Sequence, residues 1–241
     1  MSLSPTSTAS AAASPDVPAT MKALVVLEPN HFQIQEVPVP EPGPNQVLAR
    51  VRAVSICGTD AHLTDAGPVF GDASKLPPFF TRGVLVDAPS YRGVDCLPKG
   101  SAIDAAELEA ICAAEGVTVQ PWDVVLIRTG YMGLWPDVEK MAAHKTPGPD
   151  ISAARWLLER GVVATGTDTE TYEVQPAPVL GVPANPQPVH TLLLIENGIY
   201  LMESLDLEAL AKDRVYEFLF VALPVKIRGA TGSMVDPLAV V

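Results

Sequence analysis

The fold class follows from three neighbouring stretches: RGVLVDA at residues 82–88, DAAELEAICAAEG at residues 104–116 and DVVLIR at residues 123–128. The first and the third are short apolar runs of the kind that form buried strands. The middle stretch begins with a capping box of Asp104 and Glu107, continues with apolar residues at helical spacing and ends in glycine. A strand, a helix and a second strand in this order are typical of an α/β domain.

The same alternation continues towards the C-terminus. Ser152 can cap a helix that stops at Gly161, and residues 162–164 then return as a strand. More strands are predicted at residues 190–195, 199–202 and 216–223, with a short helix over residues 207–212. We therefore expect a mixed α/β domain over residues 66–241.

The N-terminal part has a different pattern. Residues 1–20 are rich in Ser, Thr, Ala and Pro, and we expect them to form a disordered tail. The runs MKALVVLE, FQIQEV and QVLARVRAVS then alternate or are apolar, with Pro/Gly-rich breaks between them, which predicts a small β-meander over residues 21–65. A loop-rich region over residues 65–81 separates this meander from the α/β domain.

Composition excludes several classes of function. With 241 residues, 48% hydrophobic and 18% charged, the chain can bury one sizeable core. A formal charge of -12 repels phosphate backbones and anionic lipid, so we expect no nucleic-acid partner. No apolar run is long enough to span a membrane. The three scattered cysteines fit a reducing compartment, and the opening run has no secretory pattern, so a cytoplasmic protein is expected.

Five segments, taken in order, resemble the family of kynurenine formamidases, isatin hydrolases and cyclases. They are KLPPFFTRGVLVDAPSYRGVD, VTVQPWDVVLIRTGY, ISAARWLLERGVVATGTDTE, PVHTLLLIENGIYLMESLDLEAL and DRVYEFLFVALPVKIRGATGSMVDPLAVV. The resemblance covers about residues 75–241. It implies a mixed sheet or a barrel-like core with flanking helices, and assembly as a homodimer or a larger oligomer.

The same resemblance implies a metal-dependent hydrolase. Family members use a divalent metal, usually Zn or Mn, to activate water against an amide, lactam or N-formyl bond. His190 and Glu203 resemble positions at or beside the metal centre, and an imidazole and a carboxylate are suitable ligands. Asp168 and Thr169 match positions that line the substrate pocket. The alternatives are a satisfied histidine at a strand end, an exposed glutamate before a helix and a plain turn after a strand.

The chief metal motif of that family, H-x-G-T-H-x-D with a further histidine four residues later, is altered in this chain. Aligning on the one suitable Gly-Thr pair places Ile56 and Asp60 at the two histidines, His62 at the aspartate and Ala66 at the last histidine. A carboxylate and an imidazole can both bind a metal. A reduced site in which Asp60 and His62 join the two later residues is therefore one hypothesis.

Residues 21–63 resemble instead the start of a zinc-dependent medium-chain alcohol dehydrogenase, whose GroES-like domain opens with such a meander. In that family the cysteine that matches Cys57 is a catalytic zinc ligand. The later G-H-E ligand segment is missing from this sequence, and no G-x-G-x-x-G follows a strand, so neither the zinc site nor the nicotinamide site can be completed. The chain therefore resembles a chimera of two unrelated families.

Three hypotheses about function follow. The first is an amidohydrolase with a reduced metal site that acts on a small aromatic amide or lactam. The second is a non-catalytic remnant that keeps the family fold without holding metal tightly. The third is a dehydrogenase fragment that binds zinc through Cys57. Metal content separates the first two hypotheses, and thiol dependence of bound zinc isolates the third.

Overall fold

The structure is a computed structural model that describes residues 17–28, 31–39, 41, 73–144, 146–175, 185–226 and 231–241. The chain divides into two compact units, Met1–Gly67 and Pro68–Val241. In the described part of the first unit, strands β1 (Thr20–Glu28) and β2 (His31–Pro38) pair antiparallel, with Met21 opposite Val37. The first two strands of the predicted meander are therefore confirmed, and its third, at residues 46–55, lies outside the described residues.

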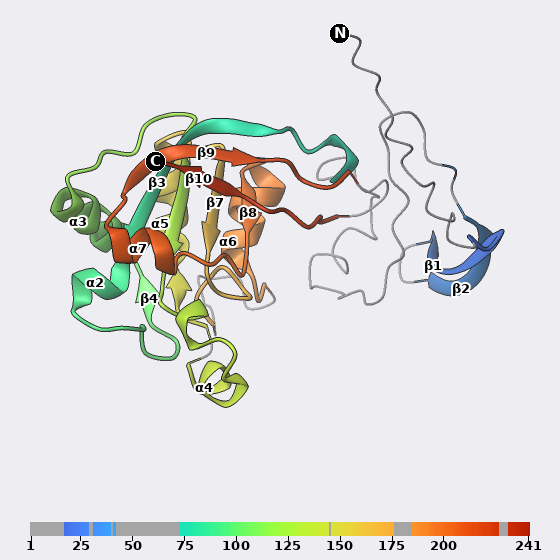
Figure 1. Ribbon diagram of the computed structural model, residues 1–241, viewed down its shortest axis with the longest axis horizontal. Helices are drawn as coiled ribbons and strands as arrows, with labels where there is room; N and C mark the ends of the chain where they lie inside the picture. Colours follow the sequence, from blue (N-terminus) through green and yellow to red (C-terminus); the bar gives the residue numbers. More distant parts are fainter. Residues whose placement is uncertain are drawn as a thin grey trace, which may run out of the picture. The chain divides into compact units, whose positions relative to one another are not determined.

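The second unit is built on a six-stranded mixed sheet in the order β10-β9-β3-β5-β7-β8 (Figure 1). Strands β3, β5, β7 and β8 are parallel, whereas β9 pairs antiparallel with β3, and β10 pairs antiparallel with β9. Their bounds are Phe79–Asp87 for β3, Val124–Arg128 for β5, Ala164–Thr167 for β7, Tyr200–Met202 for β8, Glu217–Ala222 for β9 and Leu238–Val240 for β10. The predicted α/β class with a mixed sheet is confirmed.

Helices connect these strands, as expected for parallel neighbours. They are α2 (Ala88–Arg92), α3 (Ala105–Glu115), α4 (Val138–Ala143), α5 (Ile151–Glu159), α6 (Pro188–His190) and α7 (Glu208–Asp213). Short helical turns cover Ala73–Lys75 and Met132–Leu134, and a π-helix covers Thr191–Glu196. A second, two-stranded sheet pairs β4 (Ala102–Ile103) with β6 (Gly148–Pro149).

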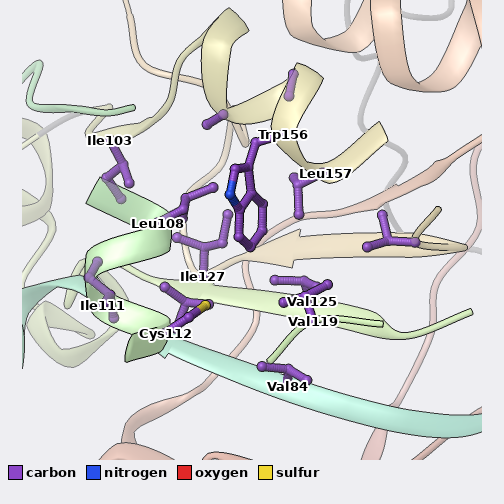
Figure 2. Close-up of a cluster of buried hydrophobic side chains, with 14 of the residues drawn as sticks. Val84, Ile103, Leu108, Ile111, Cys112, Val119, Val125, Ile127, Trp156 and Leu157 are labelled. Carbon is purple, nitrogen blue, oxygen red and sulfur yellow. The ribbon is translucent and has the colours of Figure 1, made fainter. Parts of the chain in front are cut away.

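The larger part of the core lies between the sheet and helices α3 and α5 (Figure 2). Leu108 and Ile111 of α3 and Leu157 of α5 are fully buried against Val125 and Ile127 of β5. A second cluster, which includes Leu85, Leu126 and Phe220, is fully or almost fully buried as well. Fully burying such side chains contributes about 1.5–3 kcal/mol each, so apolar packing holds the strands of this unit in place.

The helix caps differ in part from the predictions. Asp104 caps α3 as predicted, because its Oδ1 accepts the backbone N–H of Glu107 at 2.8 Å. The reciprocal half of the capping box is not made, since the Glu107 carboxylate binds Arg92 instead. The prediction that Ser152 caps α5 is wrong. Asp150 is the cap, because it stands directly before the first helical residue and its Oδ1 accepts the N–H groups of Ser152 at 2.8 Å and of the following residue at 3.0 Å.

The predicted strand at residues 190–195 is also wrong, because α6 and the π-helix occupy this segment. A run of four apolar residues fits a strand or a buried helical turn equally well, and periodicity alone cannot separate them. Pro188 stands at the first helical position, where its missing N–H costs nothing. The next two N–H groups bind the carboxylate of Glu173, so a partner from a distant part of the chain stabilises the helix.

Candidate functional site

Polar side chains gather where the parallel strands of the second unit end. Asp87 is the last residue of β3 and Arg128 the last of β5, while Asp168 follows β7 and Glu203 follows β8. In open α/β sheets, ligands bind outside the carboxyl ends of the strands. The candidate site therefore lies at this edge of the sheet.

His190 lies between two carboxylates at this edge. Its Nδ1 is 2.7 Å from Oε1 of Glu173, and its Nε2 is 3.3 Å from Oε1 of Glu203. The two residues that the resemblance placed at the metal centre, His190 and Glu203, are thus in direct contact. The histidine is not at a strand end, because it is the last residue of α6. We call Glu173, His190 and Glu203 the histidine clamp.

Sequence reasoning missed Glu173. Its side chain is fully buried, and it accepts the backbone N–H groups of Val189 at 2.9 Å and of His190 at 3.1 Å. A single glutamate in the stretch TYEV gives no periodic signal, and its partners lie 16 and 17 residues further along the chain. Only the three-dimensional arrangement reveals that this carboxylate caps α6 and contacts the imidazole.

The clamp favours the charged form of the imidazole in the metal-free chain. Burial lowers the pKa of His190, but the hydrogen bonds to Glu173 and Glu203 outweigh this effect and raise the pKa to about 9. The ring of Tyr172 packs edge-on against the imidazole with a centroid distance of 6.3 Å. The two carboxylates therefore stabilise a positive charge on the imidazole.

Two residues next to the clamp have left-handed backbone. Tyr172 precedes Glu173 and has φ 55°, and Ser204 follows Glu203 and has φ 58°. Non-glycine residues rarely adopt this conformation, which costs of order 1 kcal/mol or more and is common at functional sites. The N–H of Ser204 donates to the carbonyl of Thr169 at 2.9 Å, which fixes the turn. Each of the two glutamates of the clamp is thus next to a residue with a strained backbone conformation.

Asp168 is fully buried. Its Oδ1 accepts the N–H of Thr129 at 2.9 Å and the hydroxyl of the same residue at 2.7 Å. Burial raises the pKa of Asp168, and the hydrogen bonds from Thr129 oppose this rise. Thr169, the other residue that the resemblance placed in the pocket, is also buried and contacts the hydroxyl of Thr167 at 3.0 Å. Neither side chain reaches the surface of the cavity.

A cavity of about 580 Å³ lies beside the turn that follows Glu203. Its walls combine aromatic and thioether side chains with carboxylates, an arrangement typical of small-molecule sites. The hydroxyl of Tyr131 donates to Glu170 at 3.2 Å on one wall. The lining residues are Tyr131, Met132, Gly133, Trp135, Met141, Glu170, Ser204, Asp206 and Glu208.

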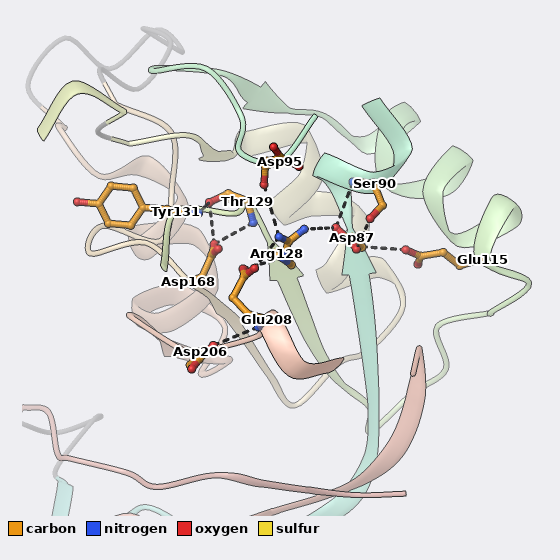
Figure 3. A network of polar contacts seen from close by, with 10 residues as sticks. All are labelled: Asp87, Ser90, Asp95, Glu115, Arg128, Thr129, Tyr131, Asp168, Asp206 and Glu208. Carbon is orange, nitrogen blue, oxygen red and sulfur yellow. Dashed lines mark hydrogen bonds and ion pairs between the residues drawn. The ribbon is translucent and has the colours of Figure 1, made fainter. Parts of the chain in front are cut away.

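A buried ion network supports one wall of this cavity (Figure 3). Arg128 donates from Nη1 to Asp87 at 2.9 Å, and from Nε and Nη2 to the two oxygens of Glu208 at 2.8 Å each. Asp87 is fully buried and its carboxylate also accepts from the hydroxyl of Ser90 at 2.6 Å. Arg128 thereby connects the ends of β3 and β5 to the start of α7, and it orients Glu208.

Glu115 makes the stability of the chain depend on pH. Its Oε1 accepts the N–H of Asp87 at 2.9 Å, its Oε2 is buried without a partner among the described residues, and burial raises its pKa to about 7. A carboxyl group whose pKa is higher in the folded than in the unfolded state stabilises the fold at a pH below its unfolded pKa. This contribution is lost as the pH rises through 7.

We expect Glu115→Gln to be more stable than the unchanged chain at pH 8 by about 1–2 kcal/mol, after allowance for partial exposure.

Urea unfolding at pH 5 and pH 8 checks this expectation. The difference between Glu115→Gln and the unchanged chain should grow with pH, because only the unchanged chain must ionise a buried carboxyl. Other titrating groups are common to both proteins and cancel in the comparison. A difference that is the same at both pH values would contradict the assignment.

The donor atoms of the clamp suit a divalent metal. Two ligands of one tetrahedral zinc, each bound at 2.0–2.2 Å, lie about 3.3–3.5 Å apart. The separation of 3.3 Å between His190 Nε2 and Glu203 Oε1 matches this value. The other two proposed ligands, Asp60 and His62, lie outside the described residues, as does Cys57. Within the described residues, no group of three or more His, Cys, Asp or Glu side chains is arranged to hold a metal ion.

The model of the Cyclase family matches residues 28–174, which is more than half of the chain. The chain belongs to the cyclase family. Similarity to this family thus begins inside the segment that also resembles an alcohol dehydrogenase. Human (Homo sapiens) sorbitol dehydrogenase is 42% identical over 55 residues, which are 23% of this cyclase-family chain and 15% of the dehydrogenase. The resemblance to two families is therefore confirmed.

Solved structures agree with the family assignment. A crystal structure of a novel cyclase is 34% identical with a TM-score of 0.59, and the match covers 67% of this chain and 54% of that one. An isatin hydrolase bound to the product analogue thioisatinate is 26% identical with a TM-score of 0.54, over 67% of this chain and 60% of that one. This cyclase-family chain thus spans less than two thirds of the length of either protein.

No helix in the described part of the chain is both long enough and apolar enough to cross a membrane.

Proposed function

We propose that this chain is a metal-dependent hydrolase that cleaves an amide, lactam or N-formyl bond in a small aromatic substrate. The observation that supports this function best is the contact between His190 and Glu203, whose Nε2 and Oε1 atoms have the spacing of two ligands of one metal. The turn at Ser204 joins this pair to the cavity. The similarity to a structure described as an isatin hydrolase agrees with this class of reaction.

In this proposal, His190 and Glu203 hold a divalent metal, Zn or Mn. Asp60 and His62, which the sequence suggests as further ligands, lie outside the described residues. When bound, such a metal supplies a water nucleophile at neutral pH and polarises the substrate carbonyl. Of the two proposed metal ligands, Glu203 is the one that can face the substrate, because its side chain is 34% exposed whereas that of His190 is 11% exposed.

The cavity provides the substrate site in this proposal. The exposed ring of Trp135 and the side chains of Met132 and Met141 offer an apolar surface for an aromatic ring. Asp168 contributes indirectly, because it fixes Thr129 and with it the segment that carries Tyr131. A homodimer and a cytoplasmic location remain proposals that rest on the resemblance and the composition.

A second candidate function is a non-catalytic member of the family. Ile56 and Ala66 stand where the family motif has its first and last histidines. Such a protein would keep the fold and bind metal weakly. A dehydrogenase fragment with zinc at Cys57 is a third candidate, supported by the 42% identity to sorbitol dehydrogenase over 55 aligned residues.

Elemental analysis of the purified chain tests these candidates. The hydrolase proposal expects about one Zn or Mn per chain and hydrolysis of N-formylkynurenine or isatin. A chain that holds no metal above background, even after incubation with excess Zn or Mn, would contradict it and support the non-catalytic candidate. Zinc that is released when thiols are blocked would point to Cys57 instead.

A further inference from the structure

Glu173 is a buried carboxylate that three N–H groups reach. We infer that it is a positioning residue that holds the His190 imidazole with Nδ1 as the hydrogen-bond donor, so that Nε2 is the nitrogen presented to a divalent metal. The part of this inference that concerns the metal rests on the proposed function. The orientation of the His190 ring does not depend on the proposed function, because the contact with Glu173 forms without a metal.

The contact at Nδ1 decides which nitrogen carries the proton. Oε1 of Glu173 is 2.7 Å from His190 Nδ1, which is the length of a strong hydrogen bond. An ionised carboxylate can only accept, so the imidazole must donate from Nδ1. The lone pair of a neutral ring is then on Nε2, which faces Glu203.

The carboxylate itself is held in one orientation. Besides Nδ1, Oε1 accepts the N–H of His190 at 3.1 Å, and Oε2 accepts the N–H of Val189 at 2.9 Å. Glu173 is fully buried, so no solvent competes for these contacts. The edge-on ring of Tyr172 limits rotation of the imidazole from another side. A histidine that binds a metal commonly donates its other N–H to a carboxylate in this way.

Nuclear magnetic resonance of the metal-free chain, labelled with ¹⁵N-histidine, tests the orientation of the ring. Four histidines give few signals, and the variant His190→Ala identifies those of residue 190. We expect a slowly exchanging imidazole proton on Nδ1 of His190. A ring that carries its proton on Nε2 alone would overturn the inference. This result needs only the unchanged chain and the variant used for assignment, so it holds even if substitutions of Glu173 impair folding.

The variant Glu173→Gln tests the consequence for the metal. Whichever way the amide turns, its NH₂ group faces an N–H of the helix or of the ring, so the contact at Nδ1 is weakened. We expect the Nδ1 proton to exchange faster with water and the dissociation constant for Zn²⁺ to rise by about 10–100-fold, because a neutral amide oxygen is a weaker acceptor than a carboxylate. An unchanged dissociation constant in a folded Glu173→Gln protein would overturn the role in positioning.

A matched control separates positioning from a general loss of stability. Glu115→Gln makes the same change at another carboxylate that accepts a backbone N–H, and it should leave both the Nδ1 signal and the Zn²⁺ affinity unchanged. If the unchanged chain shows the Nδ1 proton but binds no Zn²⁺, the proposed hydrolase function fails while the orientation of the ring stands. The two failures are therefore distinguishable.

Discussion

The variant His190→Ala is expected to lose bound metal and hydrolysis together. His190 supplies Nε2, one of the two ligand atoms that the described structure brings to within 3.3 Å of each other. Removal of a ligand should weaken metal binding by at least about 100-fold, which is the upper end of the effect of removing a residue that only supports a ligand. Elemental analysis and a hydrolysis assay on the same sample measure both losses.

His144→Ala is the matched control for this experiment. It removes an imidazole that is outside the clamp and does not line the cavity, so metal content and hydrolysis should stay at the level of the unchanged chain. Full metal content in His190→Ala would contradict the assignment of the clamp as a metal site. If the retained metal were zinc that is released when thiols are blocked, this result would indicate binding in the dehydrogenase-like segment at Cys57.

The variant Arg128→Met is expected to lower the free energy of unfolding by about 3–5 kcal/mol. Arg128 is 10% exposed, and it is paired with Asp87, whose side chain is 0% exposed. Without the guanidinium, the buried carboxyl group of Asp87 loses its charged partner, which costs far more than the lost contact itself. Urea unfolding followed by circular dichroism gives this difference in free energy.

Arg92→Met provides the comparison. Arg92 makes an ion pair with Glu107 of α3, but the two side chains are 28% and 16% exposed, so water reaches the carboxylate that remains. We expect a loss of about 1 kcal/mol or less. Equal losses for the two variants would show that the network at Arg128 is no more important for stability than an ordinary surface pair. Because Arg128 also orients Glu208 on the cavity wall, substrate binding should weaken only in Arg128→Met.

Much of the fold could be predicted where local signals agree. The apolar run before Asp87 and the run before Arg128 each have the length of a strand, and Asp104 marks the start of α3 at the residue that caps it. The segment at 190–195 could not be predicted because its apolar run is equally compatible with a strand. The helix is favoured by Glu173, whose carboxylate accepts a backbone N–H group from the first turn of α6 although it lies 16 residues away in the sequence.

The candidate site was predictable only in part, and for a physical reason. His190 and Glu203 were identified by resemblance, and the structure places them in contact. Glu173 has no local signature, because its role depends on a helix that begins 15 residues later. Asp168 was expected in the substrate pocket, but the side chain points to Thr129 and is enclosed by protein. A motif gives residue types in order and does not give the direction of each side chain.

The left-handed backbone at Tyr172 and Ser204 has a consequence for protein engineering. Glycine adopts such a conformation without a steric penalty, so a screen that rewards heat resistance alone would favour Ser204→Gly. The same change would loosen the turn that presents Glu203. Natural proteins often hold functional groups at the expense of stability. Thermostable versions of this chain should therefore be selected for retained metal as well as for a higher melting temperature.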